Sequence, residues 1–119
     1  MNTFRDLLIW QKSMNLVTEI YQLTNSFPKE EIYGLSSQIR RCSISIPSNI
    51  AEGYGRDGNS DYLRFLNISM SSLFEMQTQL EISFNLKYTT EYQFNKINGE
   101  SRELERMLSS FIRKIKDRK

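Results

Sequence analysis

The clearest chemical potential in this sequence lies in its arginine side chains. A guanidinium carries its N–H donors in a planar fork, and two of these donors can bind two oxygens of one phosphate. Arginines brought to one surface of the fold could therefore bind phosphate groups. The four that we take as candidates for part of such a surface are Arg40, Arg41, Arg56 and Arg64.

A line of polar side chains follows helical spacing through residues 38–56 and includes two of these arginines. Its members are Gln38, Arg41, Ser45, Asn49, Glu52 and Arg56. Besides the phosphate-binding surface, a second interpretation is open. The line could form hydrogen bonds and ion pairs to another helix or subunit, with Glu52 and Arg56 paired at i, i+4. The candidates for these polar contacts are Gln38, Ser45, Asn49 and Glu52.

The C-terminal segment is basic, and it also has two interpretations. Cations in the last turn of a helix complement the helix dipole, and a basic tail can also neutralise nucleic-acid phosphate. The formal net charge of the chain is only +2, so a nucleic-acid partner is indicated by local clustering and not by the overall balance. The candidate nucleic-acid-binding residues of this segment are Arg113, Lys114 and Lys116.

Catalytic chemistry is not indicated. The sequence has no His and one Cys, so neither a neutral-pH acid–base residue nor a soft-ligand metal site is set up. Cys42 falls on an apolar stripe, which favours a packing role. Gly53-x-Gly55-x-x-Gly58 follows a predicted helix and not a strand, so it is typical of an interhelix turn. We expect a protein that is not an enzyme, with no catalytic residue, metal, cofactor or small-molecule substrate.

Composition predicts an all-helical protein. The 119 residues suit a single domain spanning 1–119, and 39% hydrophobic with 25% charged residues and few Gly or Pro favour helices over strands. No apolar run approaches the roughly 20 residues of a membrane span, so we expect no membrane partner. The lone Cys is typical of the reducing cytoplasm, where we expect the protein to reside.

Hydrophobic periodicity predicts four helices that would carry these side chains. We expect them at residues 4–25, from 29 or 30 to 52, from 59 or 60 to 86, and from 90 onward. Short connections favour an antiparallel up-down-up-down four-helix bundle. Pro47 predicts a kink in the second helix, and Thr90 with Gln93 predicts a capping box at the start of the fourth.

The first predicted helix has two apolar lines, which suggests that it contacts two partners. We expect the first line to face the core and the second to widen the apolar sector. The first line consists of Leu7, Trp10, Met14, Val17, Tyr21 and Thr24. The second consists of Leu16, Ile20, Leu23 and Phe27.

Several motifs resemble those of a known family. They are Phe4-x-x-Leu7-x-x-Trp10-Gln11, Phe27-Pro28-x-x-Glu31-x-Tyr33-Gly34-Leu35-x-x-Gln38-x-Arg40-Arg41, Ser45-Ile46-Pro47-Ser48-Asn49-Ile50-Ala51-Glu52-Gly53, Tyr62-x-x-Phe65-Leu66 and Ser72-Leu73-x-Glu75. On these motifs, nearly the whole chain resembles the four-helix-bundle proteins encoded in intervening sequences of bacterial large-subunit ribosomal RNA genes. It departs at Ser69 and Ser71, where that family tends toward Ala and Gly.

The resemblance implies an oligomer, commonly a homopentameric ring, that is not an enzyme. A relative, the accessory variability determinant of diversity-generating retroelements, works with a reverse transcriptase and RNA through a basic surface. By analogy, the four arginines named first become candidates for RNA contact. Two hypotheses remain: an oligomeric protein that binds ribosomal RNA or an RNA–protein complex, and a protein-interaction scaffold without nucleic-acid binding.

Overall fold

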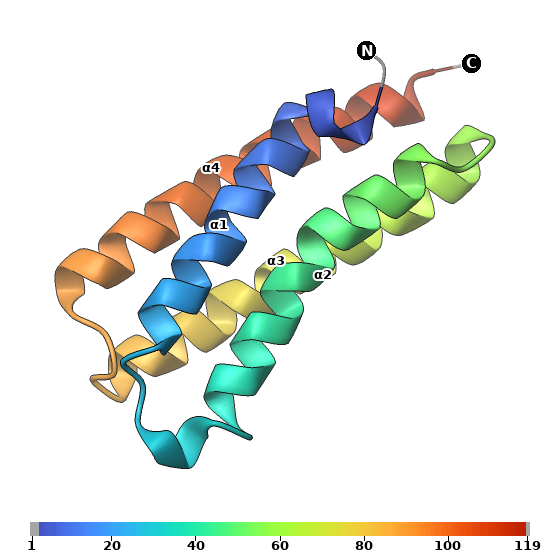
Figure 1. Ribbon diagram of the computed structural model, residues 1–119. Coiled ribbons are helices and arrows are strands. Elements are labelled where there is room, and N and C mark those ends of the chain that lie inside the picture. Colours follow the sequence, from blue (N-terminus) through green and yellow to red (C-terminus); the bar gives the residue numbers. More distant parts are fainter. Residues whose placement is uncertain (1–2, 119) are drawn as a thin grey trace.

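Four antiparallel helices form the molecule in the computed structural model, which describes residues 3–118 (Figure 1). α1 packs against α2 and α4, and α3 packs against the same two helices, so the chain runs up-down-up-down. No strand occurs within residues 3–118. The all-α bundle predicted from periodicity is therefore confirmed. The elements are η1 (Phe4–Asp6), α1 (Leu8–Thr24), η2 (Lys29–Glu31), α2 (Leu35–Tyr54), α3 (Asn59–Asn85) and α4 (Glu91–Lys116).

Two helix starts differ from the predicted ones because local caps interrupt the helical backbone. Residues 4–6 form the separate turn η1, and Leu7 is extended before α1 begins. The second helix begins at Leu35 and not at 29 or 30, because Gly34 leaves the helical conformation. The Glu31 carboxylate accepts a hydrogen bond of 3.0 Å from the Leu35 N–H and caps the new start. The predicted capping box of Thr90 is present.

The core of α1 lies on the second of its two apolar lines, which corrects the expectation that the first line faces the core. Leu16, Ile20 and Leu23 are buried, whereas Met14 is 41% exposed and Tyr21 is 37% exposed. The two lines occupy neighbouring faces of one helix, so spacing does not say which face meets the partners. In the bundle, α2 and α4 cover the second line.

Serine side chains fill the contact between α2 and α3. The Ser69 hydroxyl donates to the Ile46 carbonyl at 2.9 Å, and the Ser72 hydroxyl donates to the Ser45 hydroxyl at 2.8 Å. Small side chains let two helix backbones approach, and each of these two hydroxyls donates to an acceptor on the facing helix. α2 runs without interruption through the buried Pro47. The kink expected at Pro47 stays a prediction.

At Gly53, α2 lies very close to α3. A Cβ atom at this position would lie 2.9 Å from the Phe65 Cβ and 3.0 Å from the Tyr62 Cδ1. Both distances are shorter than normal van der Waals contact, and the Phe65 Cβ cannot move without its backbone. Only a glycine therefore allows the two helices to pack at this distance.

The two ends of the bundle are tied by different contacts. At the end that holds both termini and the α2–α3 turn, the Asn59 side chain donates to the Arg118 carbonyl at 3.1 Å (Figure 1). At the other end, the Tyr88 hydroxyl donates to the Glu31 carboxylate at 2.9 Å, and its ring packs on Phe27. Side chains on the two ends therefore belong to separate surfaces.

The packing at Gly53 predicts that Gly53→Ala lowers the free energy of unfolding by about 2 kcal/mol, the usual cost of an overpacked contact. Gly99→Ala is the matched control, because its Cβ would meet nothing within 4 Å in the exposed middle of α4. That change should raise stability by about 1 kcal/mol through helix propensity. Urea titrations of both variants measure the change in the free energy of unfolding. If Gly53→Ala stabilised the protein as much as Gly99→Ala, the close contact at Gly53 would be contradicted.

Candidate nucleic-acid interface

The seven predicted cationic residues fall into two groups on the bundle. Arg40 and Arg41 lie in the first half of α2, beside the end of α1. The other five, Arg56, Arg64, Arg113, Lys114 and Lys116, come from the α2–α3 turn, the start of α3 and the end of α4. About fifteen residues at about 1.5 Å per residue put roughly 20 Å between Arg41 and Arg56. Five of the seven thus lie at one end of the bundle, and we call those five the basic end.

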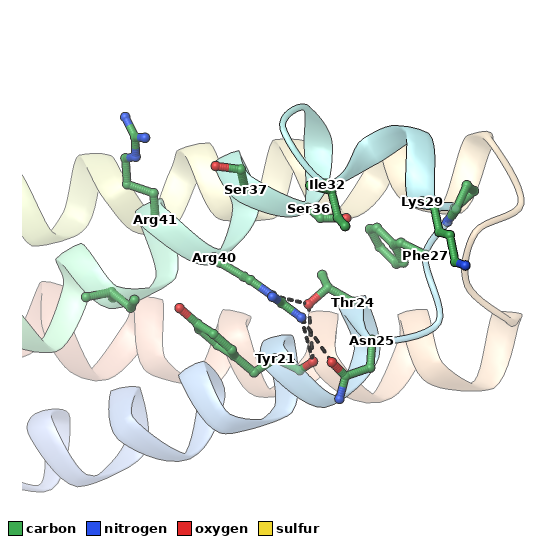
Figure 2. A pocket seen from close by; sticks show the side chains of 12 residues that line it. Tyr21, Thr24, Asn25, Phe27, Lys29, Ile32, Ser36, Ser37, Arg40 and Arg41 are labelled. Atoms are coloured by element: carbon green, nitrogen blue, oxygen red, sulfur yellow. Dashed lines mark hydrogen bonds between the residues drawn. The ribbon is translucent and has the colours of Figure 1, made fainter.

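Arg40 is committed to contacts within the chain. Its Nε donates to the Thr24 hydroxyl at 2.7 Å, and its Nη2 donates to the Asn25 side chain at 3.2 Å (Figure 2). A weaker bond of 3.4 Å reaches the Tyr21 carbonyl, and the guanidinium stacks on the Tyr21 ring at 4.6 Å. A cation here complements the carbonyl end of α1. Arg40 therefore joins α2 to α1, while contact of Arg40 with RNA stays a prediction.

Arg41 differs from its neighbour although it is only one residue further along α2. Its side chain is exposed and points away from the contacts of Arg40 (Figure 2). Within residues 3–118, its guanidinium has no ion pair or hydrogen bond to another side chain. Its charge is therefore available to a ligand.

Arg56 and Arg64 both stack on Phe65. Their guanidinium carbons lie 4.9 Å and 4.4 Å from the centre of this ring. Arg56 also forms the predicted i, i+4 ion pair with Glu52 at 3.2 Å, and Arg64 pairs with Asp61 at 3.2 Å. Such exposed pairs hold the side chains weakly. Both guanidinium groups can thus exchange a carboxylate for a phosphate at low cost.

The last turn of α4 completes the basic end. Arg113, Lys114 and Lys116 are exposed there, and the bond from Asn59 to the Arg118 carbonyl places this turn beside the start of α3. Burial raises the pKa of Tyr62 to about 12, and the positive charge of Arg118 opposes that rise. A cation of the C-terminal segment therefore acts on α3.

Arg5 was missed as a candidate by sequence reasoning. It lies in η1, at the same end of the bundle as the basic end (Figure 1), and its guanidinium stacks on the Phe4 ring at 4.6 Å. Nothing in its local sequence pairs it with residues more than a hundred positions away. η1 packs on α1 and α2, so the place of Arg5 at this end follows only from how these helices pack in the bundle.

The polar line of α2 is divided among three kinds of contact. Ser45 bonds to α3 and so forms the predicted helix–helix contact. Asn49 donates only to the Ser45 carbonyl and hydroxyl of its own helix, at 2.8 Å and 3.0 Å. Glu52 pairs with Arg56, and Gln38 is exposed. Any role of these residues between subunits stays a prediction.

Cys42 has the packing role expected of it. Its side chain is buried, and Sγ lies 3.1 Å from the Gln79 Oε1. Burial, with the Glu75 carboxylate adding to it, raises the pKa of the thiol to about 11. The reactive thiolate is therefore scarce at neutral pH. The predicted turn covers only part of the glycine segment, because Gly53 lies within α2. Residues 55–58 connect α2 to α3, with Gly58 at φ 81° directly before α3.

Fold and surface together define an all-helical up-down-up-down bundle with a basic end. Within residues 3–118, no helix is long and apolar enough to cross a membrane. The chain belongs to the family of 23S rRNA-intervening sequence proteins, whose family model matches residues 5–110. This match confirms the resemblance found in the sequence motifs. The family is not a known enzyme family.

One similar solved structure is a protein of unknown function from the S23 ribosomal protein family of Bacteroides thetaiotaomicron VPI-5482. It shares 28% sequence identity with this chain at a TM-score of 0.80. The alignment covers 88% of this chain and 98% of that chain. No curated protein matches this sequence.

The different environments of two adjacent arginines predict different effects on stability. Arg40→Ala should lower the free energy of unfolding by about 2 kcal/mol, because it leaves half-buried acceptors on α1 without their charged donor. Arg41→Ala should change it by less than about 0.5 kcal/mol, as expected for an exposed side chain without partners. Thermal and urea unfolding measure both, and an equal loss in the two variants would contradict the bridging role of Arg40.

Proposed function

We propose that this protein is a non-catalytic, oligomeric RNA-binding protein that contacts phosphates through its basic end. The observation that carries the proposal is that five cations from three separate segments of the chain lie at the same end of the bundle. Membership in a family named for 23S rRNA intervening sequences supports an RNA-related role. Phosphate contacts of Lys and Arg supply most of the affinity in sequence-independent RNA binding.

Assembly into a symmetric oligomer would strengthen this binding. One copy has a formal charge of only +2, but symmetry repeats the basic end once per subunit and so concentrates the positive field. The resemblance favours a homopentamer. The basic end can then neutralise several phosphates of one RNA at once.

Exposed apolar side chains on α3 support the assembly. Phe74 is 47% exposed and Ile82 is 42% exposed, and both line one groove of the surface. Apolar side chains grouped in this way are typical of protein interfaces. The same groove would serve the alternative function, a protein-interaction scaffold without nucleic-acid binding, in which case the partner would be another protein.

Replacing Arg113, Lys114 and Lys116 together by Gln tests the RNA proposal. We expect the affinity for ribosomal RNA fragments to fall at least about tenfold at about 0.1 M salt, because up to three phosphate contacts are lost. The slope of log affinity against log salt should become shallower by about two. Filter binding across a salt series measures both quantities.

The matched control removes the same charge elsewhere, by changing Lys87, Arg102 and Arg106 to Gln. Because these residues lie outside the basic end, the control should leave the salt slope nearly unchanged. If both triple variants lose affinity equally, only net charge matters and the assigned surface is wrong. Absence of RNA binding by the unchanged protein near physiological salt would favour the scaffold.

A second experiment tests the assembly. Phe74→Glu with Ile82→Glu should reduce the particle mass measured by light scattering to that of a monomer, because charges would be buried in the subunit contact. Circular dichroism should remain unchanged, since both side chains are exposed in one subunit. Tyr92→Glu, at an exposed position of α4, is the control. A monomeric unchanged protein would refute the oligomer.

A further inference from the structure

A groove separate from the basic end lies between the end of α1, η2 and the start of α2 (Figure 2). Its volume is about 560 Å³, which is within the range of small-ligand pockets. It lies roughly 20 Å along α2 from Arg56, so a ligand in the groove would not touch the basic end. The groove therefore needs its own explanation.

The charge of this groove is of one sign. Lys29, Arg40 and Arg41 line it, and the described residues around it include no Asp or Glu. Four other cavities of the bundle each have at least one carboxylate in their walls, contributed by Asp6, Glu19, Glu75, or Glu81 and Glu105. A groove with low-dielectric walls that carry cations and no carboxylates raises the local concentration of anions.

A hydroxyl on the wall of the groove is open to a ligand. Ser36 is only 6% exposed as a residue, lines the groove, and forms no hydrogen bond through its side chain to any residue in the described part of the chain. The buried side-chain atoms without a hydrogen-bond partner within residues 3–118 are the Glu19 Oε2 and the Thr89 Oγ1, so the Ser36 Oγ reaches the surface of the groove. Ser36 can therefore donate to an acceptor that occupies the groove.

The start of α2 supplies further donors. Ser36 and Ser37 stand in the first turn of this helix, where backbone N–H groups have no partner within the helix. The Glu31 carboxylate binds the N–H of Leu35 and does not line the groove. The amides that follow Leu35 thus remain for an anion, which the helix dipole also favours.

The remaining wall of the groove is apolar. Phe27, Pro28, Ile32 and Ile44 line it opposite the charged and hydroxyl-bearing side chains. One face of the Tyr21 ring is covered by Arg40. A ligand with one anionic group and one flat, largely apolar group matches this division, and a nucleotide has both parts.

We propose that this groove binds the phosphate of a nucleotide, with Arg41 and Lys29 supplying charge and Ser36 donating a hydrogen bond. Arg40 stays bound to α1 and forms part of the wall. The phosphate can belong to a free nucleoside monophosphate or to one nucleotide of a single RNA strand. The groove would bind it whether or not the basic end binds RNA.

Titration of the uniformly ¹⁵N-labelled protein tests the proposal, with inorganic phosphate, adenosine monophosphate and a short oligoadenylate as separate probes. We expect the amide signals of Ser36 and Ser37 to shift with a nucleotide. Arg41→Gln should weaken the binding about tenfold, and Ser36→Ala by a few fold, as for a charged and a neutral hydrogen bond. Ser36→Ala removes an unpartnered hydroxyl, so the fold should be unaffected.

The controls separate the possible sources of the phosphate. Arg106→Gln, an exposed change on α4, should leave nucleotide binding unchanged, and so should the triple change at residues 113, 114 and 116. If adenosine monophosphate shifts the amide signals, a free nucleotide is sufficient for binding. If only the oligoadenylate shifts them, the groove binds a nucleotide within an RNA strand. The proposal is wrong if no probe shifts these amides, if phosphate binds as tightly as the nucleotides, or if Arg41→Gln has no effect.

Discussion

The close packing of α2 against α3 is the contact on which the other features of this molecule depend. Gly53 allows the two backbones to approach, and the hydroxyls of Ser69 and Ser72 satisfy polar groups within the contact. Because the helices meet at this distance next to their connecting turn, Arg56 and Arg64 reach the same ring, that of Phe65. A larger residue at position 53 would push α2 away from α3 and would thereby move Arg56 away from Arg64.

Two adjacent arginines near the start of α2 have different roles. Arg40 reaches back to the end of α1 and satisfies carbonyl and hydroxyl acceptors there, whereas Arg41 remains exposed. Successive residues of a helix point about 100° apart, so one arginine can stabilise the bundle while its neighbour faces a ligand. The groove beside them combines both functions, since one wall is held by Arg40 and the available charge comes from Arg41.

Much of the fold could be predicted from local pattern. The apolar stripe of α2 that includes Cys42 is buried at Ile39, Ile46 and Ile50, because this helix has one dominant apolar face. The buried face of α1 could not be predicted in this way, since the helix has two neighbouring apolar lines and only the positions of α2 and α4 determine which one is buried. The start at Leu35 depended on a cap from Glu31, which the apolar pattern does not report.

The amino-acid pattern was sufficient for the class of fold, the number of helices and the presence of a glycine-rich turn between α2 and α3. These properties depend on residues close together in the chain. Which arginines are available, which meet at one end, and which hydroxyl in a groove lacks a partner were decided by tertiary packing. Such properties depend on distances between residues far apart in sequence, as with Asn59 and Arg118, and on competition among neighbouring side chains for the same donors and acceptors.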